Sequence, residues 1–186
     1  NKLSPIFVII LAHFFLNEKI NKTKIIVMAI SILGALMIIK PQFNLSVIPA
    51  VSGFVSAVLS GAAYVFITVI GDRESIYTTV FYYSFLSSVS CLPFFVFSFA
   101  VPNLYELSML VLLGLLAAFG QIALTSAYNS WEASEVSIYD YSNIIFSSLL
   151  GYIFLSEMPD MQSIFGGILI LSASLILYVS QKHVKN

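Results

Sequence analysis

The sequence predicts an all-α fold: a polytopic membrane helix bundle with about seven transmembrane helices. Hydrophobic residues make up 59% of the 186 residues and charged residues only 9%, with a mean hydropathy of +0.98. This balance lies well outside that of soluble domains. The apolar residues also form continuous runs, whereas the strands of a membrane β-barrel alternate apolar and polar residues. The chain is therefore expected to have a lipid bilayer as its partner.

Seven apolar segments follow one another, separated by short polar links that contain most of the charges and helix breakers. The segments are residues 3–16, 25–39, 47–71, 76–101, 107–128, 136–155 and 163–180. A helix needs about 20 residues to cross the hydrocarbon core. Segments 3–16, 25–39 and 163–180 are shorter, so they require tilt, flanking residues or local thinning of the bilayer.

The distribution of Lys and Arg predicts the orientation, because cytoplasmic links carry more of them. Alternating the links across the membrane puts six basic residues on one side and two, Lys2 and Lys40, on the other. The six are Lys19, Lys22, Lys24, Arg73, Lys182 and Lys185. The C-terminal tail, residues 181–186, is therefore predicted to be cytoplasmic. Residue 1 falls outside without a signal-peptide pattern, which suggests missing upstream helices.

Several function classes receive no support from the residues. There is no basic run to bind nucleic acid, and the single Cys91 builds neither a disulfide nor a zinc site. The sequence also has no HExxH, no GxSxG and no Gly-rich phosphate loop. We therefore expect no enzyme activity, no cofactor and no metal.

An internal repeat appears when the chain is aligned with itself so that the first two segments match the last two. The identical pairs are Phe7 and Phe146, Leu11 and Leu150, Phe15 and Phe154, Leu16 and Leu155, Glu18 and Glu157, Ile25 and Ile164, and Leu36 and Leu175. The matching segments are five spans apart, so the two copies cross the membrane in opposite directions. Inverted repeats of this kind are typical of secondary transporters.

Two stretches carry a resemblance to a known family: Ser4-Pro5-Ile6-Phe7 through Phe15-Leu16-Asn17-Glu18, and Tyr139-Asp140-Tyr141 through Phe154-Leu155-Ser156-Glu157. They resemble the drug/metabolite transporter superfamily, EamA type, over essentially the whole chain. The resemblance implies ten helices in two inverted five-helix repeats, of which this chain would be helices four to ten. Residues 1–41 would end the first repeat, and residues 47–180 would form the second.

The chain departs from the family pattern at three positions. The family often has Gly before the Glu, where this chain has Asn17 and Ser156, and many members have Pro where Ile144 aligns with Pro5. The departure at Ile144 leaves a kink in this helix open. The resemblance further implies that residues 25–39 and 163–180 form a homodimer contact.

Polar residues inside two predicted spans define a candidate substrate site. An acidic group in hydrocarbon is costly and normally faces a cavity or a partner, so Asp140 is the central candidate. Helical spacing places Ser137, Asp140, Asn143, Ser147 and Gly151 in one stripe, and Gly114, Ala118, Gln121, Thr125 and Tyr128 on one face of another helix. We predict that Asp140, Asn143, Ser147, Gln121 and Tyr128 bind the substrate. Asp140 is also the candidate for a coupling proton; the alternative is an interfacial residue at a helix end.

Three further polar residues have structural interpretations. His13 lies one turn from the cytoplasmic end and is expected to pack there, with proton transfer or substrate binding as the alternative. Glu18 and Glu157 follow helix ends where loop amides can satisfy a carboxylate, with a role in ion coupling as the alternative. The function predicted from the sequence is a secondary transporter of a small polar metabolite or drug-like molecule in the bacterial inner membrane. A channel or a non-transporting membrane scaffold stays open as the alternative, because short loops and polar stripes would look the same.

Overall fold

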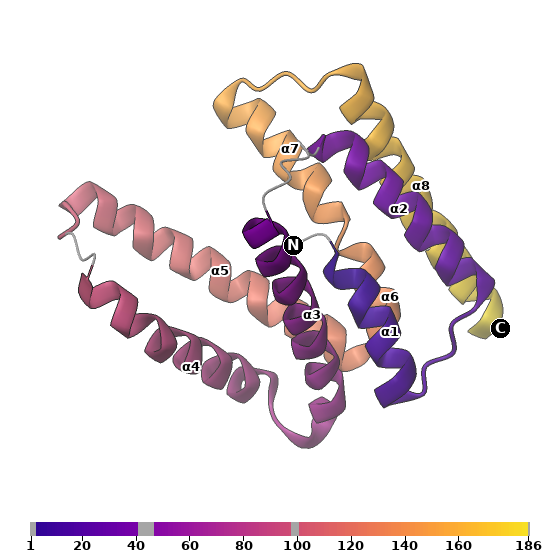
Figure 1. Ribbon diagram of the computed structural model, residues 1–186, viewed down its shortest axis with the longest axis horizontal. Helices are drawn as coiled ribbons and strands as arrows, with labels where there is room; N and C mark the ends of the chain where they lie inside the picture. The colour runs from indigo at the N-terminus through magenta and orange to yellow at the C-terminus, as the bar shows by residue number, and fades with distance from the viewer. Residues whose placement is uncertain (1–2, 41–46, 98–100, 186) are drawn as a thin grey trace. The chain divides into compact units, whose positions relative to one another are not determined.

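The computed structural model describes residues 3–40, 47–97 and 101–185, and these are helical almost throughout (Figure 1). The helices are α1 Ser4–Leu16, α2 Lys22–Ile39, α3 Val47–Ile70, α4 Ile76–Phe97, α5 Leu104–Ser130, α6 Ala133–Tyr139, α7 Ser142–Leu155 and α8 Met161–Lys185, with a 3-10 turn at Gly71–Arg73. The described ranges contain no strand. The predicted all-α fold is confirmed.

Among the residues that the structure describes, four helices are long and apolar enough to cross a membrane: Lys22–Ile39, Val51–Ile70, Leu104–Ser130 and Met161–Gln181. The apolar helix Ser4–Leu16 is shorter. Of the expected cytoplasmic tail, residues up to Lys185 continue α8, and Asn186 lies outside the described residues. These lengths fit a polytopic membrane bundle.

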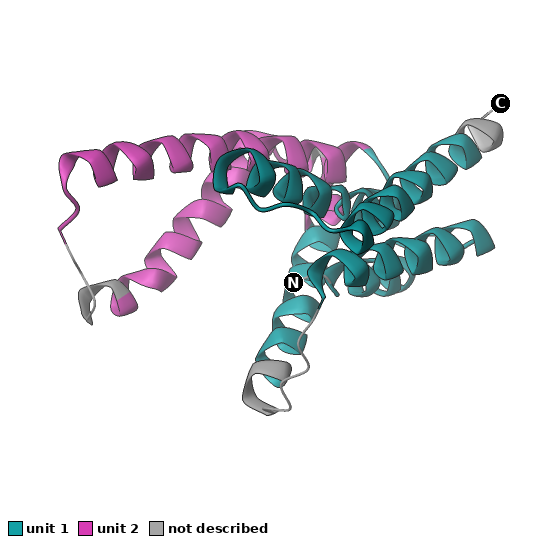
Figure 2. Ribbon diagram, turned by 90° about the horizontal axis from the view of Figure 1, so that it is seen from above, with its two compact units in different colours: residues 1–66, 131–186 teal, residues 67–130 magenta. Residues whose placement is uncertain are grey.

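The chain divides into two compact units (Figure 2). The first contains residues 1–66 and 131–186, and the second contains residues 67–130. The first unit joins chain segments that are distant in sequence because α1 packs on α6 and α2 packs along α8. Sequence order therefore does not define the compact units.

The most extensive helix pairing in the first unit is that of α2 with α8, which lie side by side (Figure 1). The two helices are antiparallel: the end of α2 at Lys40 meets the start of α8 at Asp160. Gly34 and Gly166 face each other so closely that a Cβ on either would lie 2.6 Å from the other's carbonyl oxygen. Such small residues allow membrane helices to approach each other and gain dispersion contacts. Two apolar clusters flank this contact: Ile9, Val27, Ile138, Ala173 and Leu177, and Ala35, Tyr141, Ile144 and Ile170.

The helical segment predicted at residues 136–155, in which a kink is left open, is interrupted: the structure separates α6 from α7 at Asp140 and Tyr141. The Tyr141 N–H donates to the Ile138 carbonyl at 3.3 Å, and the Asn143 N–H donates to the Asp140 carbonyl at 3.2 Å. These three-residue bonds tighten the backbone into a 3-10 geometry. The Ser142 hydroxyl also donates to the Tyr139 carbonyl. The interruption forms without proline, since Ile144 stands where the family pattern has Pro.

Local geometry recurs between α1–α2 and α7–α8 at the positions that the internal repeat aligns. Asn17 ends α1 with φ 55° and ψ 28°, and Ser156 ends α7 with φ 56° and ψ 26°. The next N–H group, of Glu18 or of Glu157, reaches back six residues to a carbonyl at 3.3 Å in both cases. The following helix is capped by Asn21 in one case and Asp160 in the other, each accepting an N–H three residues later. The same helix-turn-helix conformation thus occurs twice.

The second unit contains α4, α5 and the 3-10 turn. Asn103 and Glu106 form a reciprocal capping box at the start of α5. The Asn103 N–H donates to the Glu106 carboxylate at 2.8 Å, and the Glu106 N–H donates to the Asn103 side-chain oxygen at 2.9 Å. At the other end of α5, the Thr68 hydroxyl donates to the carbonyl of Tyr128 at 2.8 Å. Both ends of α5 are therefore fixed by side-chain hydrogen bonds.

Candidate functional site

A buried lysine connects two links of the first unit that the sequence assigns to the same side of the membrane. Lys24 is only 3% exposed. Its ammonium group pairs with Glu132, lies 3.7 Å from the Glu135 carboxylate and donates to the Ser134 hydroxyl at 2.8 Å. Burial of a charge is tolerated where it is paired and hydrogen-bonded. The start of α2 is thereby attached to the start of α6.

Glu18 caps the same end of α6. Its carboxylate accepts the N–H groups of Ala133 at 2.7 Å and Ser134 at 3.1 Å, and also the Ser134 hydroxyl. These groups lack partners within the first turn of a helix, and a carboxylate is favoured there by the helix dipole. Glu18 therefore has contacts that fit the predicted structural role, since its carboxylate caps the start of α6. His13 supports the turn through its ring Nδ1, which is 2.9 Å from the Glu18 carbonyl.

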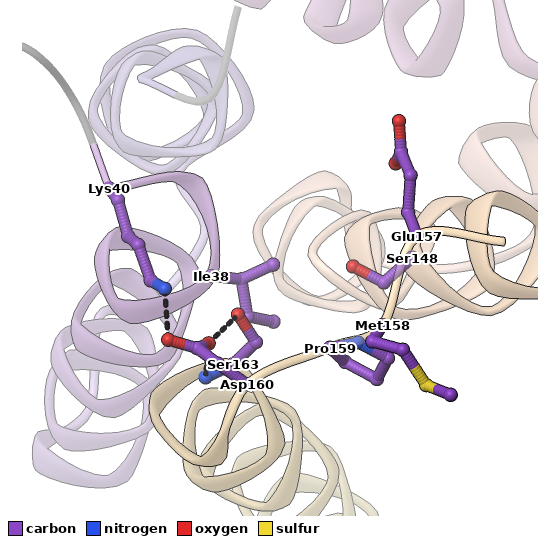
Figure 3. Close-up of a pocket in the computed structure, with 8 residues that line it drawn as sticks. All are labelled: Ile38, Lys40, Ser148, Glu157, Met158, Pro159, Asp160 and Ser163. Atoms are coloured by element: carbon purple, nitrogen blue, oxygen red, sulfur yellow. Dashed lines mark hydrogen bonds and ion pairs between the residues drawn. The ribbon is translucent and has the colours of Figure 1, made fainter. Parts of the chain in front are cut away.

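The opposite end of the first unit holds a small polar pocket of about 270 Å³ (Figure 3). Its lining residues are Ile38, Lys40, Ser148, Glu157, Met158, Pro159, Asp160 and Ser163. Lys40 pairs with Asp160, and Ser163 donates to the same carboxylate through its hydroxyl at 2.8 Å and its N–H at 3.0 Å. Hydrogen bonds from Lys40 and then Ser163 lower the pKa of Asp160 to about 2.

The stripe predicted around Asp140 is only partly preserved. Ser137 is fully buried and donates to the Ser134 carbonyl at 2.9 Å, so its hydroxyl is used within its own helix. Asp140 lies at the break between α6 and α7 and is half-buried. Asn143 and Ser147 are exposed on α7 and are brought together, with the Ser147 hydroxyl 3.2 Å from the Asn143 side-chain oxygen.

The remaining two predicted site residues lie on α5, in the second unit. Gln121 is half-buried, while Tyr128 is fully buried, as is Thr125 on the same helix face. The five candidates therefore fall into one group at the α6–α7 break and another on α5. Whether the two groups form a single site stays a prediction.

The contacts of Lys24 with Glu132, Glu135 and Ser134 were not predicted from the sequence. The signal was present in the topology, since the alternation places residues 17–24 and 129–135 on one side and residues 40–46 and 157–162 on the other. Lys24 with Glu132 and Lys40 with Asp160 are contacts between such same-side links. Opposite charges in links assigned to one side could have been paired in advance.

Comparison with known proteins identifies the family. The family model described as the EamA-like transporter family matches residues 1–40 and 47–179. The chain belongs to the EamA-like transporter family. No solved structure gives a significant match to this EamA-like chain.

Its relatives are named transporters. A pseudopaline exporter, CntI, of Pseudomonas aeruginosa (strain UCBPP-PA14) is 35% identical over 97% of this chain and 64% of its own length. An S-adenosylmethionine uptake transporter of Rickettsia bellii is 28% identical over 96% of the chain and 61% of its own length. A riboflavin transporter of Rhizobium johnstonii is 32% identical over 94% of the chain and 58% of its own length. The EamA-like chain thus spans less than two thirds of these relatives, and their names indicate transport of small metabolites rather than catalysis.

Proposed function

We propose that the full-length protein is a secondary transporter that carries a small polar metabolite across the bacterial inner membrane by alternating access of two inverted repeats. The observation that carries this proposal is the recurrence of one helix-turn-helix conformation in α1–α2 and α7–α8, with left-handed residues at Asn17 and Ser156. Because α2 and α8 are antiparallel, the two copies run in opposite directions. Inverted copies that rock against each other can expose one site to each side in turn.

The family match supports the same division of the chain. Its two matched ranges end at residues 40 and 179, which are equivalent positions in the alignment that pairs Glu18 with Glu157. We propose that residues 1–41 end the first repeat and that residues 47–180 form the second. The basic residues near Lys24 would then be cytoplasmic, together with the C-terminus.

The interruption between α6 and α7 supports Asp140 as the centre of the substrate site. α6 extends from Ala133 to Tyr139, so at 1.5 Å per residue Asp140 lies roughly 10 Å from the start of the helix. Interrupted helices in transporters leave backbone groups near the membrane midplane, where they line the binding site. The Asp140 carboxylate would attract a cationic group or carry a coupling proton. Asn143 and Ser147 would supply hydrogen bonds on the adjacent turn, and Gln121 and Tyr128 would form the second wall.

The relatives support a polar metabolite as substrate. Their names include an exporter of pseudopaline and uptake transporters of S-adenosylmethionine, so relatives of similar sequence move substrates in both directions. Homodimer formation through α2 and α8 stays a prediction from the family resemblance.

The test uses the full-length protein in proteoliposomes with an imposed proton gradient. S-adenosylmethionine, riboflavin and an untargeted extract of polar metabolites serve as probes. We expect saturable, gradient-dependent flux of at least one compound, and Asp140→Asn should abolish that flux or remove its pH dependence. Glu74→Gln, which changes an exposed acid in a link, is the matched control. Unchanged flux and pH dependence in Asp140→Asn would refute the site, while non-saturable conductance would favour a channel.

A further inference from the structure

Glu18 and Glu157 occupy equivalent positions in the two copies but differ in their partners. Each follows a left-handed residue, and the N–H of each bonds to a carbonyl six residues earlier at 3.3 Å. The Glu18 carboxylate holds two N–H groups and a hydroxyl at the start of α6. Within the described part of the chain, no residue donates a hydrogen bond to the Glu157 carboxylate. The carboxylate of the motif is therefore hydrogen-bonded to a helix start in the first copy, at Glu18, and not in the second copy, at Glu157.

The surroundings of Glu157 have room for a partner. Its side chain lines the pocket of about 270 Å³ and points away from the Lys40–Asp160 pair (Figure 3). One carboxylate oxygen would lie 3.0 Å from a Cβ on Gly151, the residue equivalent to Ala12. The cation of the pocket, Lys40, is already paired with Asp160. A group that binds Glu157 must therefore supply its own hydrogen-bond donors.

We propose that Glu157 caps a short helix of the full-length protein that precedes residue 1 and is the counterpart of α6. In the alignment that pairs Glu157 with Glu18, the start of α6, Ala133 and Ser134, has its equivalent six to seven residues before Asn1. α1 begins at Ser4 with Pro5 in its first turn, as α7 begins at Ser142, so the upstream helix would join α1 as α6 joins α7. The matched relatives have the required length, since the chain covers only 64% of the pseudopaline exporter.

The consequence is a pair of equivalent attachments at opposite ends of the first unit. Glu18 attaches the start of α6 to the turn between α1 and α2, and Glu157 attaches the start of the upstream helix to the turn between α7 and α8. Ser163 stands at the position equivalent to Lys24, so the second attachment lacks the buried ammonium group. We therefore expect Glu157 to hold its helix less tightly than Glu18 holds α6.

The inference rests on the inverted repeat proposed above, and it is tested without substrate, so its failure is distinguishable from a failure to transport. The full-length protein carrying Cys91→Ser receives Met158→Cys and a second cysteine eight residues before Asn1. A short thiol-specific cross-linker should join them. The matched control pair, Lys19→Cys with Glu132→Cys, occupies the equivalent positions at Glu18. Cross-linking of the control pair without the test pair would overturn the proposal.

A second measurement isolates the carboxylate of Glu157. Glu157→Gln should raise the rate at which a polar maleimide labels the upstream cysteine by about tenfold, because a charge-assisted bond is lost. Labelling of a cysteine at Glu132 should not change in this variant, and Glu18→Gln should give the reverse pattern. Equal labelling with Glu and Gln at position 157 would show that the carboxylate does not hold the helix, even if the cross-link forms. Since the cross-link is measured with Glu157 intact, a poorly folded Gln variant does not leave the proposal untested.

Discussion

The adjacent glycines Gly166 and Gly167 provide a test of the α2–α8 contact. A Cβ on Gly166 would lie 2.6 Å from the carbonyl oxygen of Gly34 and 2.9 Å from Cγ1 of Ile38, whereas a Cβ on Gly167 meets nothing within 4 Å. Ordinary contacts are about 3.5 Å or longer. Gly166→Ala therefore requires the helices to separate by nearly 1 Å.

The expected magnitude follows from that separation. A gap of about 0.5 to 1 Å removes a quarter to a half of the dispersion energy of each contact, and overpacking costs about 1 to 3 kcal/mol. Replacing Gly by Ala also favours a helix by up to about 1 kcal/mol, but this gain is common to both variants. Gly166→Ala should therefore have a free energy of unfolding about 1 to 3 kcal/mol below that of Gly167→Ala.

The assay is reversible unfolding of the full-length protein in bicelles, with both variants measured in the same lipid. Gly34→Ala is the partner experiment, because its Cβ would lie 2.6 Å from the carbonyl oxygen of Gly166. It should match Gly166→Ala. Equal stability of the Gly166 and Gly167 variants, or a more damaging Gly167→Ala, would refute the close approach of α2 and α8.

Three further predictions concern polar groups of the first unit. Lys24→Met should lower the free energy of unfolding by about 1 to 3 kcal/mol, because the largely buried Glu135 loses its cation while Glu132 is more than half exposed to solvent. Asp160, whose pKa is lowered from 3.8 to about 2, should stabilise the fold above pH 4 and lose that contribution as the pH falls toward 2, where protonation breaks its contact with Lys40. Ser156→Gly should stabilise by up to about 1 kcal/mol, because φ is 56° at this position and glycine adopts the left-handed region without steric cost.

Each of these predictions has a matched comparison. Lys22→Met changes an exposed lysine and should stay within about 0.5 kcal/mol of the parent; an equal loss in both lysine variants would contradict the role of burial. For Asp160, unfolding of the parent and of Asp160→Asn is followed from neutral pH to pH 2, and a stability difference that does not shrink on acidification would argue against the ion pair. Ser148→Gly, inside α7, should destabilise, so a gain there equal to that of Ser156→Gly would dismiss the conformational argument.

The positions of the helices could largely be predicted from the sequence because they depend on local properties. Hydrophobic runs placed α2 at residues 25–39, and the structure extends it to Lys22–Ile39 with Asn21 as the cap. The Phe-Leu-x-Glu sequence, which the self-alignment places at both turns, coincides with two turns of the same backbone geometry. The recurrence of left-handed Asn17 and Ser156 gives a physical meaning to the family's frequent Gly at these positions.

The candidate site was predicted less completely. Helical periodicity assumed a continuous helix through Asp140, but the hydrogen bonds of Tyr141 and Asn143 to carbonyls three residues earlier interrupt it. Hydropathy falls over Asp140, Ser142 and Asn143, but such a polar stretch inside a span looks the same whether the helix continues or is interrupted. The inward position of Ser137 was likewise missed, since a hydroxyl that bonds within its own helix looks the same in sequence as one that faces a substrate path.

The sequence by itself determined the membrane environment, the succession of helices and the family, because each is recorded in local composition or in motifs along the chain. Only the tertiary structure decided which glycine of the Gly166–Gly167 pair meets α2, and that Lys24 is buried with carboxylates far away in the sequence. Contacts of this kind depend on which faces of two distant helices meet. That choice is made by packing of the whole unit, and no local pattern encodes it.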